Sequence, residues 1–138
     1  MYLGRKESRE SAMRLLFEIG YNMDEKEDIL NRYLDNNTNK LSSDDYKYIK
    51  DIVSGAMGNL SAIDLKIEQY SRGWKVNRIS KIDLAILRLA VYELLYTDIP
   101  DGVAINEAVE LAKSYGEEKS SSFVNGIQLF ITDSIDMR

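Results

Sequence analysis

The chain has 138 residues, of which 44% are hydrophobic and 30% charged, and its formal net charge is −5. These values are ordinary for a single folded domain. The sequence contains neither cysteine nor histidine, which excludes disulfides, thiolate nucleophiles, Ser-His-Asp triads and the commonest metal ligand. No apolar run approaches the roughly 18 residues of a membrane-spanning helix. We therefore expect a protein of the cytoplasm that holds no metal or cofactor and does not enter a membrane.

Hydrophobic residues recur at helical spacing along most of the chain, and no segment shows the sustained alternation typical of a strand. In chain order, the pattern predicts helices over six segments: 5–20, 25–36, 43–72, 80–96, 103–115 and 120–135. A short turn over 74–78 separates the third from the fourth. With this turn counted as a short helix, the sequence predicts an all-α protein of about seven helices. We expect one domain over 1–138, with an N-terminal half near 1–72 and a C-terminal half near 73–138.

The third predicted helix contains two glycines, Gly55 and Gly58. Each costs up to about 1 kcal/mol relative to alanine inside a helix, so we expect them to permit the close approach of another helix. The helix over 80–96 is apolar on nearly all sides, which is typical of a helix at the centre of a fold. Because an unpaired charge is costly in such a place, we predict that Arg88 and Glu93 each have a partner.

Charge is segregated along the sequence. Residues 1–14 carry four basic and two acidic side chains, residues 66–88 carry six and two, and residues 93–118 carry one and seven. Because exposed charges are screened beyond about 8–10 Å at cellular ionic strength, an acidic protein can still present a local basic surface. The first two segments are candidates for such a surface.

Two sets of side chains are candidates for contact with a nucleic acid. Arg5 and Arg9 are four residues apart on one helical face, a spacing that suits neighbouring phosphates; the alternative is a solvated helix start. Tyr70 beside Arg72, and Phe123 in the first turn of the last helix, offer rings on which bases stack. The alternative for these rings is core packing, which is the favoured interpretation for Tyr70.

No catalytic site is expected from the residues present. Without histidine and cysteine, the remaining candidates are Glu107 and Glu110, which are three residues apart on one helix. Exposed acids on helices are usually solvated, so we expect no enzymatic activity.

The C-terminal half carries an ordered series of motifs. They are Asp83-x-x-Ile86-Leu87-Arg88-x-Ala90-x-Tyr92-Glu93-Leu94, then Pro100, then Val103-x-Ile105-Asn106-Glu107-Ala108-Val109-Glu110-Leu111-Ala112-Lys113, then Phe123-Val124-Asn125-Gly126. This series resembles the NusB family of transcription antitermination factors. The basic start, Arg5-Lys6-x-x-Arg9, resembles the arginine-rich first helix of that family, so the resemblance covers essentially the whole chain.

The resemblance implies an all-helical fold of two small bundles packed across one another. It implies binding of single-stranded, boxA-type RNA together with NusE, a basic ribosomal small-subunit protein. The pair then joins the RNA polymerase antitermination complex, so that ribosomal RNA operons are read through.

The resemblance also implies functional residues, position by position. Arg5, Lys6 and Arg9 match the basic motif for RNA, whereas Asp83 matches an acidic position that faces NusE. The predicted RNA-binding set, completed by aromatic positions and by neighbouring polar residues, is Arg5, Lys6, Arg9, Tyr70, Arg72, Lys119, Ser122 and Phe123. The hypothesis requires Arg5, Arg9 and Phe123 to lie on one continuous surface.

The sequence departs from the family pattern in three places. Glu7 interrupts the basic start, Ser121 and Ser122 stand where relatives can carry basic residues, and Gln128 stands where leucine is usual. Two other functions remain open. One is a helical protein-interaction module without RNA binding. The other is a stand-alone relative of the RNA-binding domain of ribosomal RNA methyltransferases, although no glycine-rich cofactor loop is present. A homodimer that covers the RNA-binding face is an alternative assembly.

Overall fold

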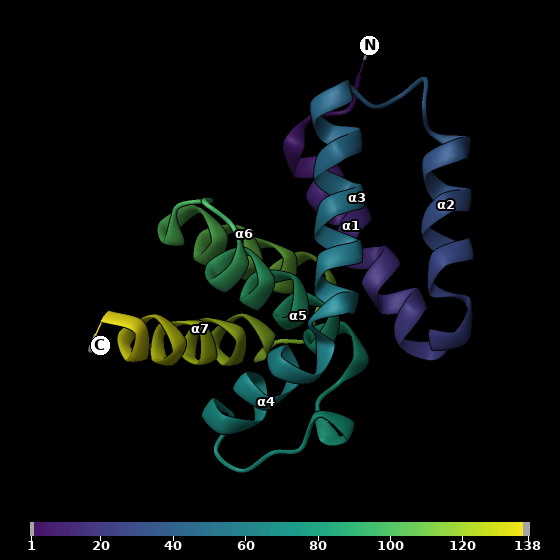
Figure 1. The fold of residues 1–138 in the computed structure, drawn as a ribbon. Coiled ribbons are helices and arrows are strands. Elements are labelled where there is room, and N and C mark those ends of the chain that lie inside the picture. Colours follow the sequence, from purple (N-terminus) through teal and green to yellow (C-terminus); the bar gives the residue numbers. More distant parts are fainter. Residues whose placement is uncertain (1, 137–138) are drawn as a thin grey trace.

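The computed structural model describes residues 2–136, and within them the protein is built from helices without any strand (Figure 1). The elements are α1 (Arg5–Tyr21), η1 (Met23–Glu25), α2 (Lys26–Asn36), α3 (Ser43–Gly58), α4 (Leu60–Tyr70), η2 (Val76–Arg78), α5 (Lys81–Tyr96), α6 (Asp101–Tyr115) and α7 (Ser120–Asp136). The two η elements are single turns of 3-10 helix. The predicted all-α fold is confirmed. None of the helices in this part of the chain is long and apolar enough to cross a membrane.

The prediction of one long helix over 43–72 is wrong, because the chain breaks at Asn59. The Asn59 backbone leaves the helical region, with φ −120° and ψ 22°. Its side-chain amide donates a hydrogen bond of 2.8 Å to the carbonyl oxygen of Gly55. Asparagine favours such local bonds to the backbone over helix continuation. The helix α4 then packs against α5 and α7, so the two groups of helices meet at Asn59 rather than near residue 72.

Helix α5 lies at the centre of the molecule, as its apolar sequence predicts. It packs against α1, α3, α4, α6 and α7, and most of its length is buried. Its first turn is capped by Ser80, whose hydroxyl oxygen accepts a hydrogen bond of 3.2 Å from the Asp83 backbone N–H. Figure 1 shows α2 and α3 standing upright beside each other, while α6 and α7 lie across them on the other side of α5.

The contact between α3 and α5 depends on Gly55. A β-carbon at this position would overlap the phenol ring of Tyr92, so any larger residue would force this ring to move. This confirms the expected close approach of another helix at Gly55. The same expectation is wrong for Gly58, because a β-carbon there would meet no atom within 4 Å. Gly58 is the last residue of α3 rather than an interior one.

Arg88, on α5, has the partner that its burial requires. Its Nε and Nη2 atoms each donate a hydrogen bond of 2.9 Å to the carboxylate of Asp64 on α4. Two parallel bonds of this kind fix the relative orientation of both groups. The pair therefore ties α4 to the central helix and holds the chain that follows α4 in place.

Candidate nucleic-acid interface

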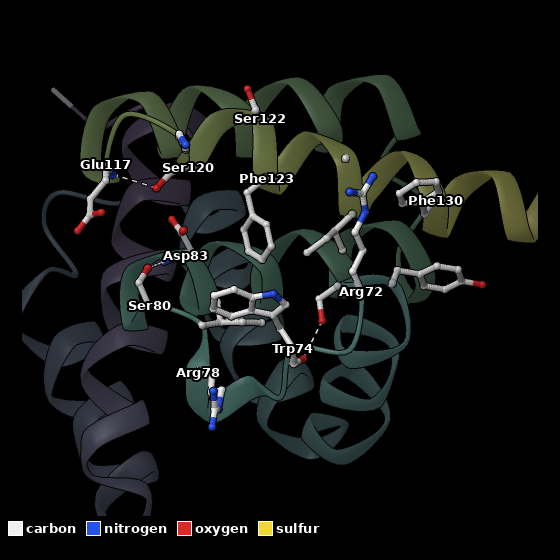
Figure 2. A pocket seen from close by; sticks show the side chains of 16 residues that line it. Arg72, Trp74, Arg78, Ser80, Asp83, Glu117, Ser120, Ser122, Phe123 and Phe130 are labelled. Atoms are coloured by element: carbon white, nitrogen blue, oxygen red, sulfur yellow. Dashed lines mark hydrogen bonds between the residues drawn. The ribbon is translucent and has the colours of Figure 1, made fainter.

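A pocket of about 730 Å³ lies between the α4–α5 connection and the first half of α7. Figure 2 shows the side chains that line it. The pocket brings together six of the nine residues that the sequence nominates, namely Tyr70, Arg72, Asp83, Lys119, Ser122 and Phe123. These residues come from three separate segments of the chain and are brought together by the fold.

Aromatic rings form the pocket walls. Figure 2 shows the Phe123 ring reaching down from α7 and the Trp74 indole reaching in from the connection after α4. Trp74 is 53% exposed. Tyr70 is stacked on Phe130, with ring centroids 6.4 Å apart and ring planes inclined by 15°. Tyr70 also packs against the core. The predicted core packing of Tyr70 is therefore present, although the same residue also lines the pocket.

The segment that presents Trp74 is held in an unusual backbone conformation. Arg72 and Gly73 both have positive φ, of 56° and 84°, a region that is unfavourable for arginine. The buried Ser71 hydroxyl donates to the Trp74 carbonyl oxygen at 2.7 Å. Farther on, the Val76 backbone N–H donates to the Glu68 carboxylate at 2.9 Å. The tight turn is thus fixed on both sides, and the indole is held at the pocket.

Cations outnumber acids around the pocket. Arg72, Arg78 and Lys119 are exposed at its edge, and the acidic lining residues are Asp83 and Glu117. Arginine and lysine beside exposed rings are the combination that single-stranded nucleic acid requires, because cations pair with phosphates while rings stack on bases. The pocket therefore offers chemistry for both parts of a nucleotide.

Asp83 lies on the pocket wall rather than on an outward acidic surface. The residue is 9% exposed, and its Oδ1 atom is buried without any hydrogen-bond partner among the described residues. In Figure 2 its carboxylate points toward the start of α7. The predicted contact of Asp83 with a partner protein stays a prediction.

The expectation that Arg9 is free to bind phosphate is wrong. Arg9 is 5% exposed, and its Nε and Nη2 atoms donate hydrogen bonds of 3.0 Å and 2.9 Å to the carboxylate of Glu93 on α5. The Tyr48 hydroxyl lies 3.4 Å from the same carboxylate. The first turns of α1 are therefore packed against α5. The prediction that Glu93 has a partner is confirmed, and that partner is Arg9.

Burial and pairing set the protonation of this cluster. Burial by itself would lower the pKa of the Arg9 guanidinium, but the hydrogen bonds to Glu93 and the nearby negative charge hold that pKa above its ordinary value. Burial, reinforced by the Glu93 carboxylate, raises the pKa of the Tyr48 phenol. Arg9 is thus paired with Glu93 beside a neutral Tyr48, and its charge is not available to a ligand.

Arg5 and Lys6 remain at the surface. The Arg5 Nε atom donates a hydrogen bond of 2.6 Å to Asp45, and its guanidinium lies 4.3 Å from the centre of the Tyr48 ring. The Arg5 side chain is still 45% exposed. Lys6 is exposed. These two residues can meet a phosphate, with Arg5 already partly neutralised by Asp45.

The expected single surface built from both ends of the chain does not form. Neither Arg5, Lys6 nor Arg9 lines the pocket. Figure 1 shows the start of α1 at the top of the view and the α4–α5 connection at the bottom. A smaller hollow shares Ser80 and Glu117 with the pocket and reaches the C-terminal half of α1. The pocket thus extends toward the end of α1 and not to its basic start. The continuous surface that the hypothesis requires is therefore not found, and a role in RNA binding depends on the pocket instead.

Comparison with known proteins identifies the family. Residues 6–128 match the sequence profile of the NusB family. The chain belongs to the NusB family. The transcription antitermination protein NusB of Acetivibrio thermocellus is 51% identical over 126 residues, which are 91% of this chain and 86% of that protein.

Solved NusB structures have the same fold. The structure of NusB from T. maritima matches with a TM-score of 0.86 and 39% identity, covering 96% of this chain and 93% of that one. A complex of the antitermination factors NusB and NusE with double-stranded RNA contains a chain that matches with a TM-score of 0.83 and 27% identity, covering 94% of this chain and 96% of that one. The two packed groups of helices described above are therefore the NusB fold.

The pocket residues of this NusB-family chain that were not nominated from its sequence include Trp74, Arg78 and Phe130. Trp74 is the only tryptophan, and it stands in a polar connection between Gly73 and Lys75, outside every apolar stripe. That isolation is a usable signal for an exposed ring. Phe130 follows the apolar pattern of its helix but is 48% exposed, and nothing in the local pattern indicates this. Within residues 2–136, no cluster of acidic side chains suits a metal ion.

Proposed function

We propose that this NusB-family chain is a transcription antitermination factor of the cytoplasm. It binds boxA-type single-stranded RNA together with NusE and joins the RNA polymerase antitermination complex, which then reads through ribosomal RNA operons. The observation that carries the proposal is the pocket, in which the exposed Trp74 and the half-buried Phe123 stand among three cations. Family membership supplies the biological role.

The pocket binds RNA by stacking and charge together. Bases stack on Trp74 and Phe123, at roughly 1–3 kcal/mol for each base. Arg72 and Lys119, at the edge, pair with the phosphates of the same nucleotides. Arg5 and Lys6 act separately, on phosphates of a strand that extends beyond the pocket. The strand is therefore held mainly at the pocket and only secondarily at the start of α1.

NusE contributes to the same RNA-binding surface. A homologous NusB has been seen with NusE and RNA in one complex. A composite surface binds RNA more tightly than either protein alone, and the coupling is reciprocal and typically 1–3 kcal/mol. RNA should therefore strengthen the binding of NusE by the same factor by which NusE strengthens the binding of RNA.

Fluorescence anisotropy of a labelled boxA-like RNA, titrated with the chain alone and with the chain plus NusE, tests the proposal. We expect binding that tightens when NusE is present. If about three phosphates are neutralised, the logarithm of the association constant falls against the logarithm of salt concentration with a slope near −2. Lys119→Ala should make the slope shallower, whereas Lys50→Ala, which removes an exposed cation from α3, should leave it unchanged. Affinity that ignores salt would contradict the ionic part of the proposal.

Two simpler experiments separate the alternatives. A protein-interaction module would retain its partners in a pull-down treated with ribonuclease and would bind no labelled RNA. A methyltransferase relative would transfer a methyl group to ribosomal RNA in the presence of S-adenosylmethionine, and we expect no such transfer.

A further inference from the structure

Phe130 is a half-exposed ring that the fold holds in a fixed place. It follows the apolar pattern of α7, yet it is 48% exposed and lines the pocket. Tyr70 of α4 is stacked on it, with ring centroids 6.4 Å apart and ring planes inclined by 15°. Single exposed apolar side chains are common and by themselves assign no function. What matters here is where this ring lies relative to the other pocket residues.

Phe130 and Phe123 lie on the same face of α7. The two residues are seven positions apart, which is two helical turns or about 10 Å along the helix axis, and both line the pocket. A strand with stacked bases advances about 3.4 Å for each nucleotide. The two rings are therefore separated by roughly three nucleotides of such a strand, and a strand that runs along α7 meets both.

A free cation stands between the two rings. Figure 2 shows the Arg72 side chain rising between Phe123 and Phe130. Arg72 is exposed, and it forms no ion pair with any residue of the described part of the chain. Its positive φ of 56° is unfavourable for arginine, and strained residues of this kind cluster at ligand sites. The guanidinium is thus available to a phosphate that joins two stacked bases.

A protein partner is the other class of ligand that covers exposed rings. The pocket edge carries Arg72, Arg78 and Lys119, and this excess of positive charge favours a polyanion over a basic protein. Rings that alternate with cations along one line are typical of surfaces that bind single-stranded nucleic acid. The observations therefore favour RNA as the molecule that covers Phe130.

We propose that Phe130 is a second stacking position for RNA, two helical turns beyond Phe123, and that the bound strand runs along α7. This inference rests on the proposed function, because it extends the path of RNA within the same site. One base stacks at Phe123 and Trp74, and another stacks on the exposed part of the Phe130 ring. Arg72 pairs with a phosphate between them, and Tyr70 is a positioning residue that holds the Phe130 ring in place.

Protein variants test the role of the ring. In anisotropy titrations of boxA-like RNA with the full chain, Phe130→Ala should weaken binding about fivefold to tenfold, in the lower part of the range for a stacked base. Phe130→Leu, which keeps an apolar side chain without a ring, should lose as much, and Phe130→Tyr should bind normally. Leu129→Ala is the matched control, because Leu129 is 45% exposed on the same helix but outside the pocket. It should leave the affinity unchanged.

Modified RNA provides a second arm. Abasic nucleotides, which keep the phosphate and remove the base, replace the nucleotides of the boxA-like RNA one at a time. With the unchanged chain, we expect two sensitive positions about three nucleotides apart. Phe130→Ala should make one of them insensitive, because ring and base act as one unit, and Trp74→Ala should do the same for the other. If Phe130→Ala fails to fold, the scan with the unchanged chain decides, and a single sensitive position overturns the inference.

The outcomes distinguish this inference from the proposed function. If the unchanged chain binds no RNA, the proposed function itself fails. If RNA binds and Phe130→Ala keeps the full affinity, the function stands and the second stacking position is wrong. If Phe130→Leu binds RNA as the unchanged chain does while Phe130→Ala binds more weakly, the side chain serves packing rather than stacking, and the inference is overturned. A loss of NusE binding without a loss of RNA binding would overturn it as well.

Discussion

Two acidic residues of α5 show how differently the two ends of one helix are used. Glu93 is 1% exposed, and both of its carboxylate oxygens accept hydrogen bonds from Arg9. Asp83, ten positions earlier, is nearly as buried, yet one of its oxygens has no partner in the described chain. The interface of α5 with α1 and α3 is therefore complete in itself, whereas the start of α5 borders an open pocket.

The comparison teaches that burial of a charge does not by itself distinguish structure from function. Arg9 matches the basic motif of the family, and Asp83 matches an acidic motif. Their roles follow from what lies opposite each of them. A charge that the protein pairs internally, like that of Arg9, is not available to a ligand, whereas one oxygen of the Asp83 carboxylate has no such partner at the wall of a pocket.

The largest expected effect comes from breaking the buried ion pair between Arg9 and Glu93. Arg9→Leu leaves Glu93 buried without a counter-charge, so the free energy of unfolding should fall by about 3–5 kcal/mol. The measurement is urea denaturation followed by circular dichroism. Arg5→Leu, in which the paired arginine is largely exposed, should cost no more than about 1 kcal/mol.

The double variant Arg9→Leu/Glu93→Leu refines that prediction. Replacing both members of a buried ion pair by apolar residues is often close to neutral, so much of the lost stability should return. A double variant as unstable as Arg9→Leu alone would show that the damage comes from packing, and the role assigned to the pair would be wrong.

The next largest effect concerns the packing of α3 against α5. Gly55→Ala places a β-carbon against Tyr92, and overpacking of this kind typically costs 1–3 kcal/mol of unfolding free energy. Gly58→Ala is the matched control, because its β-carbon meets nothing and should change stability by less than about 0.5 kcal/mol. Equal losses in thermal denaturation would contradict the described contact between α3 and α5.

At the pocket, we expect substitutions to reduce the affinity for RNA rather than the free energy of unfolding. Trp74→Ala should weaken RNA binding by about 1–3 kcal/mol, since one stacking ring is removed. The stability of the fold should hardly change, because the indole is half exposed. Tyr96→Ala removes another exposed ring, at the far end of α5, and should leave the affinity as it is. A comparable loss for both variants would mean that the pocket is not the site.

The smallest effect separates backbone strain from charge. Arg72→Asn removes the cation but places a residue that tolerates positive φ at this position. We expect unfolding free energy to stay the same or rise by up to about 1 kcal/mol, together with weaker RNA binding. Reduced stability would indicate that the Arg72 side chain supports the turn, and the strain argument would then be wrong.

The sequence predicts much of the fold because helical periodicity is a local property. Each apolar stripe gives a helix near its observed place, and the continuous apolar surface of 80–96 identifies the central helix. The break at Asn59 escapes this reasoning, since it depends on one side chain bonding to its own backbone. Neither the apolar pattern nor the two nearby glycines marks that position.

The site is harder to predict from the sequence, because its residues come together only in the folded structure. Family resemblance nominates Tyr70, Phe123 and Asp83, and the fold does bring them to one pocket. The same resemblance nominates Arg9, whose partner Glu93 lies 84 residues away. No local pattern reveals such a contact. Trp74 is missed for the opposite reason: it belongs to no pattern at all.

Trp74 permits the most direct test of the central claim, that the pocket is where RNA binds. It is the only tryptophan of the chain and stands at the pocket, so its fluorescence reports on this place alone. Titration with unlabelled boxA-like RNA should quench the emission in a saturable way, with the same midpoint as the anisotropy measurement. Binding seen by anisotropy with an unchanged tryptophan spectrum would contradict the account, because the strand would then lie elsewhere.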